Sequence, residues 1–321
     1  MPRILSALLA AAAVAMTSVG ASAQQPYPNQ LVRIVVPFSA GSATDLLARA
    51  LADKLGEKWK QQVIVENRPG IAGTTTVAKS TADGYTLMLT SNGHTVAGVL
   101  NKSLQFDPVK DFAGITPVAS VPLVLIVNPE LPAKTLKEFI DLAKAKPGSL
   151  NFASPGLGST TFIAGALFKD AAKLDLVHVP YKGAPEANMS VVRGDSQMYF
   201  TPASTAVELV QSGKVRALGV ATDQRVPSMP DVPTLKESGL PGFAYESWFG
   251  LMAPAGTPAA IVEKVNKDTI EVLQDKALQE RMAKQGGVVV VTSTPKQFDE
   301  TIKSDTARYG KIFQDAGIAA K

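Results

Sequence analysis

The sequence predicts an α/β fold with two lobes joined by two crossover strands. Strand-like and helix-like segments alternate along most of the 321 residues, which is typical of βαβ units and of mainly parallel sheets. The alternation falls into two series, separated by the proline-interrupted, β-rich segment ITPVASVPLVLIVNPEL (115–131), which is too long for one ordinary strand. The roughly 300 residues that follow a candidate leader are also enough for two domains.

The first 23 residues have the pattern of a signal peptide. Arg3 precedes a largely apolar run over 4–16, and Ala21-Ser22-Ala23 matches the A-x-A pattern of a signal-peptidase site. The apolar run is shorter than the roughly 20 residues that a membrane-spanning helix needs. We therefore expect cleavage after Ala23 and export of the mature chain.

The first series begins with a continuous apolar strand and an amphipathic helix that carries Leu47, Leu51 and Leu55 on one stripe. The segment QQVIVEN follows as a strand that RPGIAG ends, and GYTLMLT follows as a third strand. In this series we expect strands over 31–38, 61–67 and 84–90 and helices over 45–58 and 74–81.

The second series repeats this order of elements after the β-rich segment. We expect helices over 136–146, 160–173, 184–193 and 204–212, and strands over 150–154, 176–181, 196–201 and 215–222. From Trp248 onward the chain is expected to return to the first lobe, with long helices over 258–274 and 295–314.

Two segments are interpreted as the crossover strands, VASVPLVLIVN (118–128) and VRALGVATDQR (215–225). They divide the chain into a first lobe, residues 24–121 plus 222–321, and a second lobe, residues 122–221. Two lobes joined in this way can open and close on a hinge, and ligands of such folds bind in the cleft.

Each series contains one loop of glycine and small hydroxyl residues between a strand and a helix, FSAGSATD (38–45) and SPGLGST (154–160). The first N–H groups of a helix lack intrahelical partners, and the helix dipole makes that end partly positive. Glycine lets a ligand approach the backbone, and Ser or Thr adds a hydroxyl donor. Two such ends across a cleft would suit one carboxylate or the two carboxylates of a diacid.

Local structural roles for these loops stay open. Ser42 and Asp45 fit a capping box, and Asp45 with Arg49 forms an (i, i+4) helix pair. Neither loop matches a nucleotide-binding motif, because no Gly-Lys-Ser/Thr is present and GLGSTTF lacks the third glycine of the dinucleotide fingerprint.

Composition and missing motifs exclude several function classes. The chain has no cysteine, which excludes disulfides, thiolate metal sites and a cysteine nucleophile. The net charge is +4, and the Lys and Arg residues are spread among acidic residues without forming a basic run. We therefore expect no nucleic-acid partner. Neither G-x-S-x-G nor H-E-x-x-H occurs, so we expect no metal, no cofactor and no enzymatic activity.

The two histidines have different expected roles. His94 follows the third strand, where a cleft loop should lie, and is either a ligand contact or a capping or solvated residue. His178 stands between two valines of a strand and is expected to be structural. Trp248 and Phe249 either pack in the core or form a cleft wall.

Several segments resemble one known family. YPNQLVRIVVPFSAGSATDLLARALADKL, VIVENRPGIAGTTTVAKSTADGYTLML and FDPVKDFAGITPVA are similar to the Bug-type extracytoplasmic solute receptors of the tripartite tricarboxylate transporter (TTT) family. KPGSLNFASPGLGSTTFIAGALF, HVPYKGAPEA and SWFGLMAPAGTP are similar as well. The resemblance covers essentially the whole mature chain in order, which makes it far more specific than either loop alone.

The resemblance implies a type II, Venus-flytrap binding protein of the periplasm. Such a receptor captures a small di-, tri- or aromatic carboxylate and hands it to membrane permease subunits of the transporter. In this family backbone amides, hydroxyls and ordered water of the two loops hold the carboxylate. By position the resemblance implicates Phe38, Ser39, Gly41, Ser42, Thr44 and Asp45, then Ser154, Gly158, Ser159 and Thr160, and at a further strand end Thr201 and Ala203.

Two departures from the family pattern leave the identity of the acid open. Ser42 stands where the family usually has a second glycine, and SNGHT (91–95) replaces a frequent Asn-Pro pattern, which adds His94 and Thr95 as candidates. We expect a monomer. Two alternatives remain, a sensor that presents its ligand to a membrane signalling protein and an exported α/β hydrolase.

Overall fold

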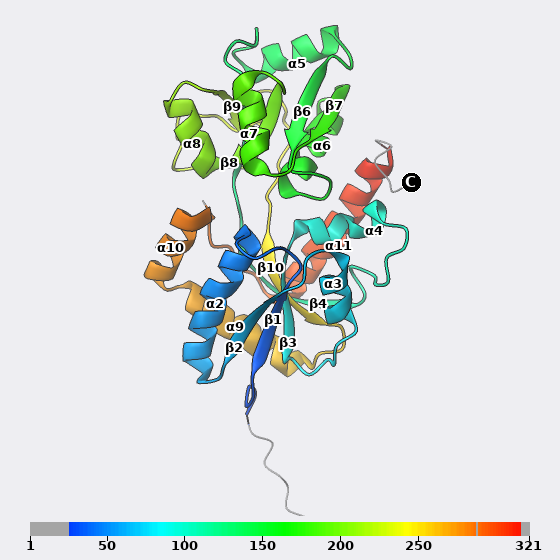
Figure 1. Cartoon of the computed structure of the whole chain (residues 1–321), viewed down its shortest axis with the longest axis vertical. Coiled ribbons are helices and arrows are strands. Elements are labelled where there is room, and N and C mark those ends of the chain that lie inside the picture. The colour runs from blue at the N-terminus through cyan, green and yellow to red at the C-terminus, as the bar shows by residue number, and fades with distance from the viewer. Residues whose placement is uncertain (1–25, 287, 316–321) are drawn as a thin grey trace, which may run out of the picture.

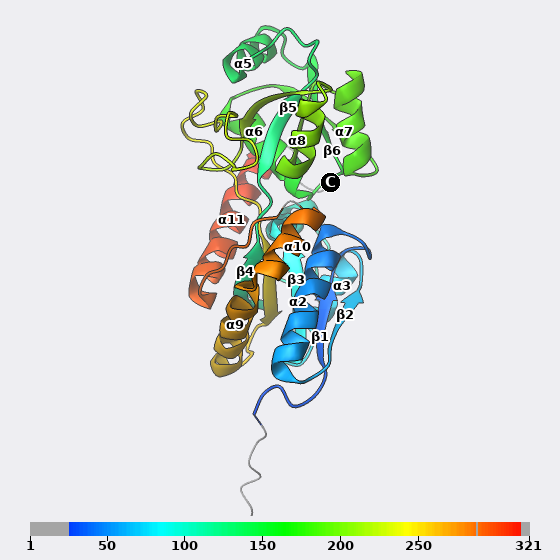
Figure 2. The same cartoon turned by 90° about the vertical axis from the view of Figure 1, so that its left-hand side faces the viewer.

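The computed structural model describes residues 26–286 and 288–315, so the predicted signal peptide and its cleavage site lie outside the described residues. The molecule is elongated, with one α/β lobe above the other (Figure 1). The two lobes also stay separate in the view turned by 90° (Figure 2). None of the helices in this part of the chain combines the length and the apolar character needed to span a bilayer.

The first lobe contains a five-stranded sheet in the order β2-β1-β3-β10-β4. Its strands are β1 (Val32–Val36), β2 (Val63–Asn67), β3 (Thr86–Ser91), β4 (Phe112–Ala119) and β10 (Phe249–Pro254). Its helices are α2 (Ala43–Trp59), α3 (Ile71–Ala78), the 3₁₀ helix η1 (Asn92–Val96), α4 (Ala97–Leu100), α9 (Ala259–Leu273), α10 (Lys276–Gly286) and α11 (Pro295–Asp315).

The second lobe repeats this plan with a sheet in the order β7-β6-β8-β5-β9. Its strands are β5 (Leu123–Val127), β6 (Leu150–Ser154), β7 (Leu176–Pro180), β8 (Met198–Pro202) and β9 (Arg216–Val220). Its helices are α5 (Leu136–Ala145), α6 (Thr160–Ala171), α7 (Ala184–Arg193) and α8 (Ala203–Gln211).

Each sheet mixes parallel and antiparallel pairs, so the expectation of mainly parallel sheets needs correction. β1 pairs in parallel with β2 and β3, and β6 pairs in parallel with β7 and β8. In contrast, β10 and β5 are antiparallel to both of their neighbours. These two strands enter their lobe from the other lobe, at the cleft end of the sheet. The carboxyl ends of the remaining strands therefore face the cleft.

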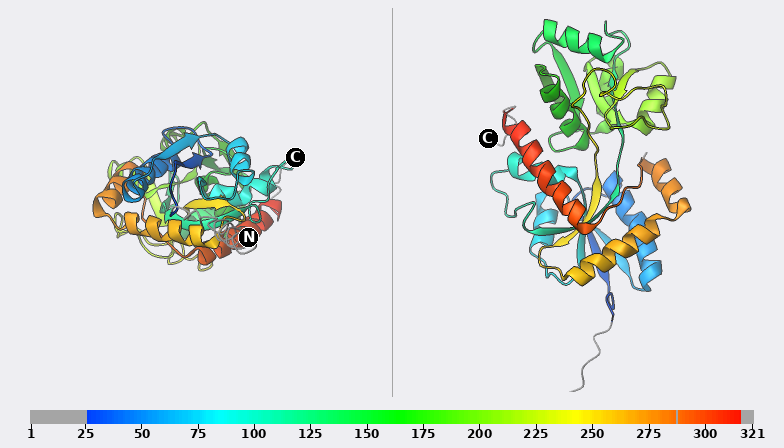
Figure 3. Two further views of the ribbon diagram at one scale, coloured as in Figure 1. Left: turned by 90° about the horizontal axis from the view of Figure 1, so that it is seen from below. Right: turned by 180° about the vertical axis from the view of Figure 1, so that it is seen from behind.

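The first crossover is not one continuous strand. β4 ends at Ala119 in the first sheet and β5 begins at Leu123 in the second, so the segment predicted over 118–128 is two strands. The second crossover is not the strand predicted over 215–225 either. β9 ends at Val220 inside the second lobe, and the chain returns to the first lobe through residues 221–248 before β10 begins. The two connections pass side by side between the lobes (Figure 3).

A serine joins the two connections. The Ser247 hydroxyl accepts a hydrogen bond from the Val121 amide (3.0 Å) and donates one to the Val121 carbonyl (2.8 Å), and Ser247 is buried. The pairing satisfies two backbone groups of the first connection with one side chain of the second. This contact holds the two connections together at one point of the hinge.

The return segment first packs against the second lobe. The Leu235 amide donates to the Val220 carbonyl (2.9 Å), and the Phe243 ring lies 6.1 Å from the Phe168 ring. Packing therefore extends the second lobe about as far as Phe243, beyond the predicted limit at 221. The limits of the two lobes as folding units stay a prediction.

Most predicted helices are present, with differences that have local causes. In α2 the apolar stripe is buried, including Leu47, Leu51 and Leu55. α3 begins at Ile71, three residues before the predicted start, because Gly70 adopts φ 78° and ends the preceding turn. Neither α10 nor the two short helices of 92–100 were predicted from the sequence pattern.

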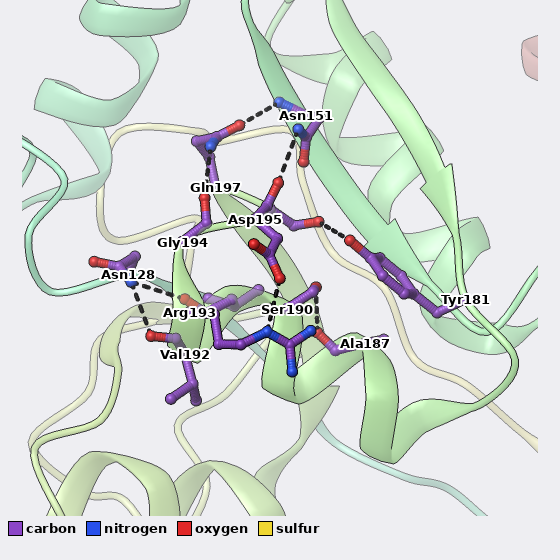
Figure 4. A network of polar contacts seen from close by, with 12 residues as sticks. Asn128, Asn151, Tyr181, Ala187, Ser190, Val192, Arg193, Gly194, Asp195 and Gln197 are labelled. Atoms are coloured by element: carbon purple, nitrogen blue, oxygen red, sulfur yellow. Dashed lines mark hydrogen bonds and ion pairs between the residues drawn. The ribbon is translucent and has the colours of Figure 1, made fainter.

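A polar network fixes the amino end of β8, at the end of the second sheet remote from the cleft (Figure 4). The Gln197 carbonyl oxygen Oε1 accepts from the Asn151 amide (2.9 Å), and the Tyr181 hydroxyl bonds the Ser196 hydroxyl (2.9 Å). The Asn128 amide group donates to two carbonyls at the end of α7. These bonds tie β5, β6 and α7 to β8 and hold the sheet that carries the second loop.

Candidate ligand-binding site

The facing strand ends enclose a cavity of about 420 Å³ between the lobes. The first lobe contributes the end of β1, the start of α3 and the segment after β3, and the second lobe contributes the loop between β6 and α6. The lining residues are Pro37, Phe38, Gly70, Ile71, Thr74, Thr90, Gly93, His94, Ala97, Leu100, Asn101, Phe106, Pro155, Gly156, Leu157, Gly158 and Ser159.

Four of the residues predicted from the sequence line this cavity, namely Phe38, His94, Gly158 and Ser159. The structure therefore brings the two predicted loops together, but most of their hydroxyl residues are not on the wall. The predicted residues outside the lining are Ser39, Gly41, Ser42, Thr44, Asp45, Thr95, Ser154, Thr160, Thr201 and Ala203.

Asp45 organises the first loop from within. Its carboxylate is almost fully buried and accepts hydrogen bonds from the Gly41 amide (2.8 Å), Arg49 Nε (3.1 Å) and Asn67 Nδ2 (2.9 Å). Burial alone would raise the pKa of Asp45, but these donors outweigh it and lower the pKa. Asn67 also donates to the Phe38 carbonyl (3.2 Å), so a residue missed by the sequence reasoning fixes a cavity wall.

Ser42 caps α2 by accepting a hydrogen bond from the Asp45 amide (3.2 Å). In a full capping box the Ser42 amide would donate to the Asp45 carboxylate. Here the Ser42 amide donates to the Ser39 carbonyl instead, and the Asp45 carboxylate accepts from the Gly41 amide. Thr44 is buried in the first turn. Local structure thus explains most of the hydroxyl residues of the first loop.

The second loop is held in shape by its own hydroxyls. Ser159 caps α6, accepting from the Phe162 amide (3.2 Å) and donating to the Gly156 carbonyl (2.9 Å). The Ser154 hydroxyl accepts from the Gly156 amide (3.0 Å) and bonds His178 Nε2 (2.7 Å). The first amides of α6, those of Thr160 and Thr161, have no intrahelical acceptor and lie at the cavity end of the helix.

His94 lines the cavity but belongs to an aromatic cluster. Its Nε2 lies 2.8 Å from the Pro108 carbonyl, and because a carbonyl only accepts, Nε2 carries the proton. The ring stacks on Phe106 and meets the edge of Phe112. Burial lowers the pKa of His94 to about 4, although the bond to Pro108 acts against the shift. The imidazole is therefore neutral at pH 7 and is not a charged partner for an acid.

The lobes touch at one edge of the cavity. A Cβ atom on Gly93 would lie 2.5 Å from the Gly158 carbonyl oxygen, so glycine alone allows this approach. Beside it, Asn92 Nδ2 donates to the Tyr245 hydroxyl (2.5 Å), which donates to the Thr160 carbonyl (3.0 Å). Tyr245 thus links both lobes through the return connection. It stands three residues before Trp248, which the sequence analysis singled out together with Phe249.

The remaining predicted residues have interior positions. Thr201 is fully buried, and its hydroxyl has no partner among the residues that the structure describes. Ala203 is buried, and its amide donates to the Pro122 carbonyl (2.9 Å). The Thr95 hydroxyl donates to the Asn92 carbonyl (2.7 Å). Trp248 packs on Phe298 in the core, and core packing is one of the two roles expected for it.

A larger cavity, of about 900 Å³, lies at the end of the first lobe remote from the cleft. It is formed by the amino end of β4 and by α9 and α11, and Glu263, Lys296, Asp299 and Lys303 are among its lining residues. Neither strand-to-helix loop reaches it. Size alone therefore does not identify the site, and the interlobe cavity is the one that the fold builds from two matched loops.

No group of three His, Cys, Asp or Glu side chains within 26–286 and 288–315 is placed to hold a metal ion. Two α/β lobes, two hinge connections and a cavity between facing loops define the class of bilobal solute-binding proteins. The chain belongs to the tripartite tricarboxylate transporter receptor family, whose model matches residues 47–318. The fold class and the family expected from the sequence are both confirmed.

Similar proteins agree with this membership. The chain is 34% identical to protein BugT of Bordetella pertussis, over 99% of each chain. It is also similar to the solved structures of R. palustris Rpa4515 with adipate (31% identity, 92% and 100% coverage, TM-score 0.76) and of the periplasmic binding protein BugD (32%, 92% and 100%, 0.74). The structure of MatC from Rhodopseudomonas palustris with bound malate is also similar, with 31% sequence identity and a TM-score of 0.74. The match covers 89% of this chain and 99% of MatC.

The family and these neighbours are binding proteins, and the chain is a solute-binding protein and not an enzyme. Members of the family are periplasmic.

Proposed function

We propose that this protein captures a small organic carboxylate in the interlobe cavity and delivers it to a membrane permease of the tripartite tricarboxylate type. The observation that carries the proposal is the cavity itself, at which the capped N-terminus of α6 meets the end of β1 and its loop. The structures with adipate and with malate show that similar proteins bind carboxylates.

In the proposed capture, neutral groups and not charged side chains hold the carboxylate. The Thr160 and Thr161 amides would donate to the carboxylate, and the α6 dipole adds a favourable potential there. Gly158 and Ser159 line the same end of the cavity. Phe38 and His94 would close the first-lobe side, and the Asp45 network would hold the first loop in place behind them.

The proposal includes the cellular setting. Export through the N-terminal signal peptide with cleavage after Ala23, action as a monomer and independence of any cofactor all belong to it. Lobe closure on the ligand would create the surface that the permease recognises.

Replacement of one amide tests the site directly. Thr160 is the first residue of α6, where proline is tolerated, and Ser159 has φ −69° and ψ 149°, the conformation favoured before proline. Thr160→Pro therefore deletes one N–H donor while the helix and the Thr160 carbonyl remain. The matched control Thr160→Ala keeps the amide and removes only the side chain.

We expect an acid that stabilises the wild-type protein to bind Thr160→Pro about 10- to 100-fold more weakly, the effect of losing one charge-assisted hydrogen bond. Thermal shifts against citrate, C4 to C8 diacids, acidic amino acids, phthalates and benzoates identify the acid, and calorimetry gives the affinities. Thr160→Ala should bind like the wild type. Equal affinities for the proline and alanine variants would show that α6 does not hold the carboxylate.

A further inference from the structure

The return connection, residues 221–248, passes between the lobes (Figure 3) and carries Tyr245. The Tyr245 backbone amide donates to the Ala221 carbonyl (2.8 Å), just after the end of β9. The side chain is only 2% exposed, and its ring lies 6.3 Å from the Tyr309 ring of α11. Backbone and ring contacts therefore hold the Tyr245 hydroxyl in one place between η1 and α6.

The Tyr245 hydroxyl makes two hydrogen bonds whose directions are fixed by chemistry. A carbonyl only accepts, so the hydroxyl proton lies on the bond to the Thr160 carbonyl (3.0 Å). The hydroxyl oxygen then accepts from Asn92 Nδ2 (2.5 Å). Burial raises the pKa of Tyr245 well above its usual value, so the hydroxyl keeps this proton at pH 7. The donors therefore point in one order, from η1 to α6.

The bond to Thr160 reaches the group that is proposed to hold the ligand. The Thr160 carbonyl and the Thr161 amide are the two ends of one peptide group, and this amide has no intrahelical acceptor. A hydrogen bond accepted by the carbonyl polarises the peptide group and strengthens the amide as a donor. A chain of hydrogen bonds thus runs from Asn92 through Tyr245 and this peptide group to the position of the carboxylate.

The first-lobe end of this hydrogen-bond chain is anchored in the cavity wall. Asn92 is fully buried, and its backbone amide donates to the Trp248 carbonyl (3.0 Å). The next two residues, Gly93 and His94, line the cavity. In the part of the chain that the structure describes, no hydrogen bond joins η1 directly to α6. The Tyr245 hydroxyl is therefore the polar link between these two elements.

We infer that Tyr245 is a positioning residue for ligand capture, whose hydroxyl orients the peptide group between Thr160 and Thr161 toward the acid and ties it to the first lobe. This inference rests on the proposed function, because it assigns a further residue to the same site. The two bonds of the hydroxyl end on different lobes, so rotation of the lobes apart must break one of them. A bound acid and the hydroxyl favour the same closed arrangement, and each therefore stabilises the other.

Removal of one oxygen atom tests this role on the full mature protein. Tyr245→Phe deletes only the hydroxyl. Tyr309→Phe is the matched control, because it deletes a second buried tyrosine hydroxyl, from the neighbouring ring, whose partner is the Asp305 side chain of the same helix. The probe is the acid of the panel named above that stabilises the wild-type protein most.

We expect Tyr245→Phe to bind this acid about tenfold more weakly than the wild type, the effect of losing one buried hydrogen bond. Stopped-flow kinetics should place the loss in the dissociation rate and change the association rate by less than about twofold, because the hydroxyl acts after the acid has docked. Tyr309→Phe should lose stability but keep both rate constants.

A purely structural role would lower the stability of both variants and leave both dissociation rates unchanged. That result would overturn the inference and leave the proposed function standing. If no acid of the panel stabilises the wild-type protein, the inference and the proposed function both fail.

A second variant cuts the same hydrogen-bond chain from the first lobe, which keeps the test decisive if Tyr245→Phe does not fold. Asn92→Ala removes the donor to the Tyr245 hydroxyl but retains the backbone bond to Trp248. We expect dissociation of the acid to be about three- to tenfold faster than from the wild type. In small-angle X-ray scattering the ligand-free variant should have a larger radius of gyration, and saturating acid should restore the wild-type profile. An unchanged dissociation rate in Asn92→Ala would contradict the link between η1 and α6.

Discussion

At the scale of single residues, His94 links the stability of the cavity wall to pH. An unfolded histidine takes up a proton below about pH 6.5, whereas burial lowers the pKa of folded His94 to about 4. Between these values the unfolded state binds more protons, so the free energy of unfolding falls as the pH drops from about 6.5 to about 4. The two pKa values correspond to a loss on the order of 3 kcal/mol.

Urea unfolding at pH 7 and pH 4.5 measures this effect. In the variant His94→Gln the amide can still donate to the Pro108 carbonyl but cannot titrate, so its stability should depend less on pH than that of the wild type. His178, half-buried and with its pKa also lowered to about 4 by burial, contributes equally to both proteins. An identical loss in the two proteins would contradict the role given to His94.

The sequence located some site residues better than others, for physical reasons. Phe38 and Ser159 flank the strand-to-helix junctions that the local pattern located, and the family resemblance then implicated both residues by position. Thr201 was implicated by the family resemblance as a strand end, yet its side chain faces the interior because its direction depends on the register with Val124 of β5. Phe106 was missed because it lies in a loop whose packing on His94 is not encoded by spacing.

At the scale of elements, the contact between η1 and the α6 loop controls how far the lobes can close. A Cβ atom on Gly93 would lie 2.5 Å from the Gly158 carbonyl, and neither a backbone oxygen nor a capped loop can move aside cheaply. Gly93→Ala should therefore hold the lobes apart. The strain of overpacking, about 1–3 kcal/mol, predicts ligand binding that is weaker by about 5- to 150-fold.

Gly98→Ala is the matched control, because no atom lies within 4 Å of a Cβ built on Gly98, in the neighbouring α4. It should bind ligand like the wild type, and both variants should retain nearly full thermal stability without ligand. If Gly93→Ala binds as tightly as Gly98→Ala, the Gly93–Gly158 contact does not limit closure.

The types of the elements followed from the sequence more readily than the directions of the strands. Periodicity and turn signals located the apolar strands and the helix over 184–193, since these patterns are local. β5 and β10 read as ordinary apolar strands, but they are antiparallel to their neighbours because they arrive from the opposite lobe. α10 is polar apart from a few apolar residues such as Leu278 and Met282, and the 3₁₀ turn of η1 depends on the Ser91 cap.

At the scale of the whole molecule, α11 forms a third connection between the lobes. It packs on β4 and η1 in the first lobe and continues to α6 in the second (Figure 1). Near its end Phe313 is fully buried, and its ring meets Phe162 of α6 edge-on at 5.4 Å. The two crossovers set the hinge, and this aromatic contact opposes opening away from it.

Truncation of Phe313 should therefore loosen the lobes as well as lower stability. We expect Phe313→Ala to cost about 3–5 kcal/mol of unfolding free energy and to raise the radius of gyration of the ligand-free protein in small-angle X-ray scattering. Ile302→Ala is the control, because Ile302 is equally buried on the same helix but belongs to a core cluster of the first lobe. It should lose similar stability with an unchanged scattering profile. Superimposable profiles for the two variants would mean that α11 follows the first lobe alone and does not restrain the second.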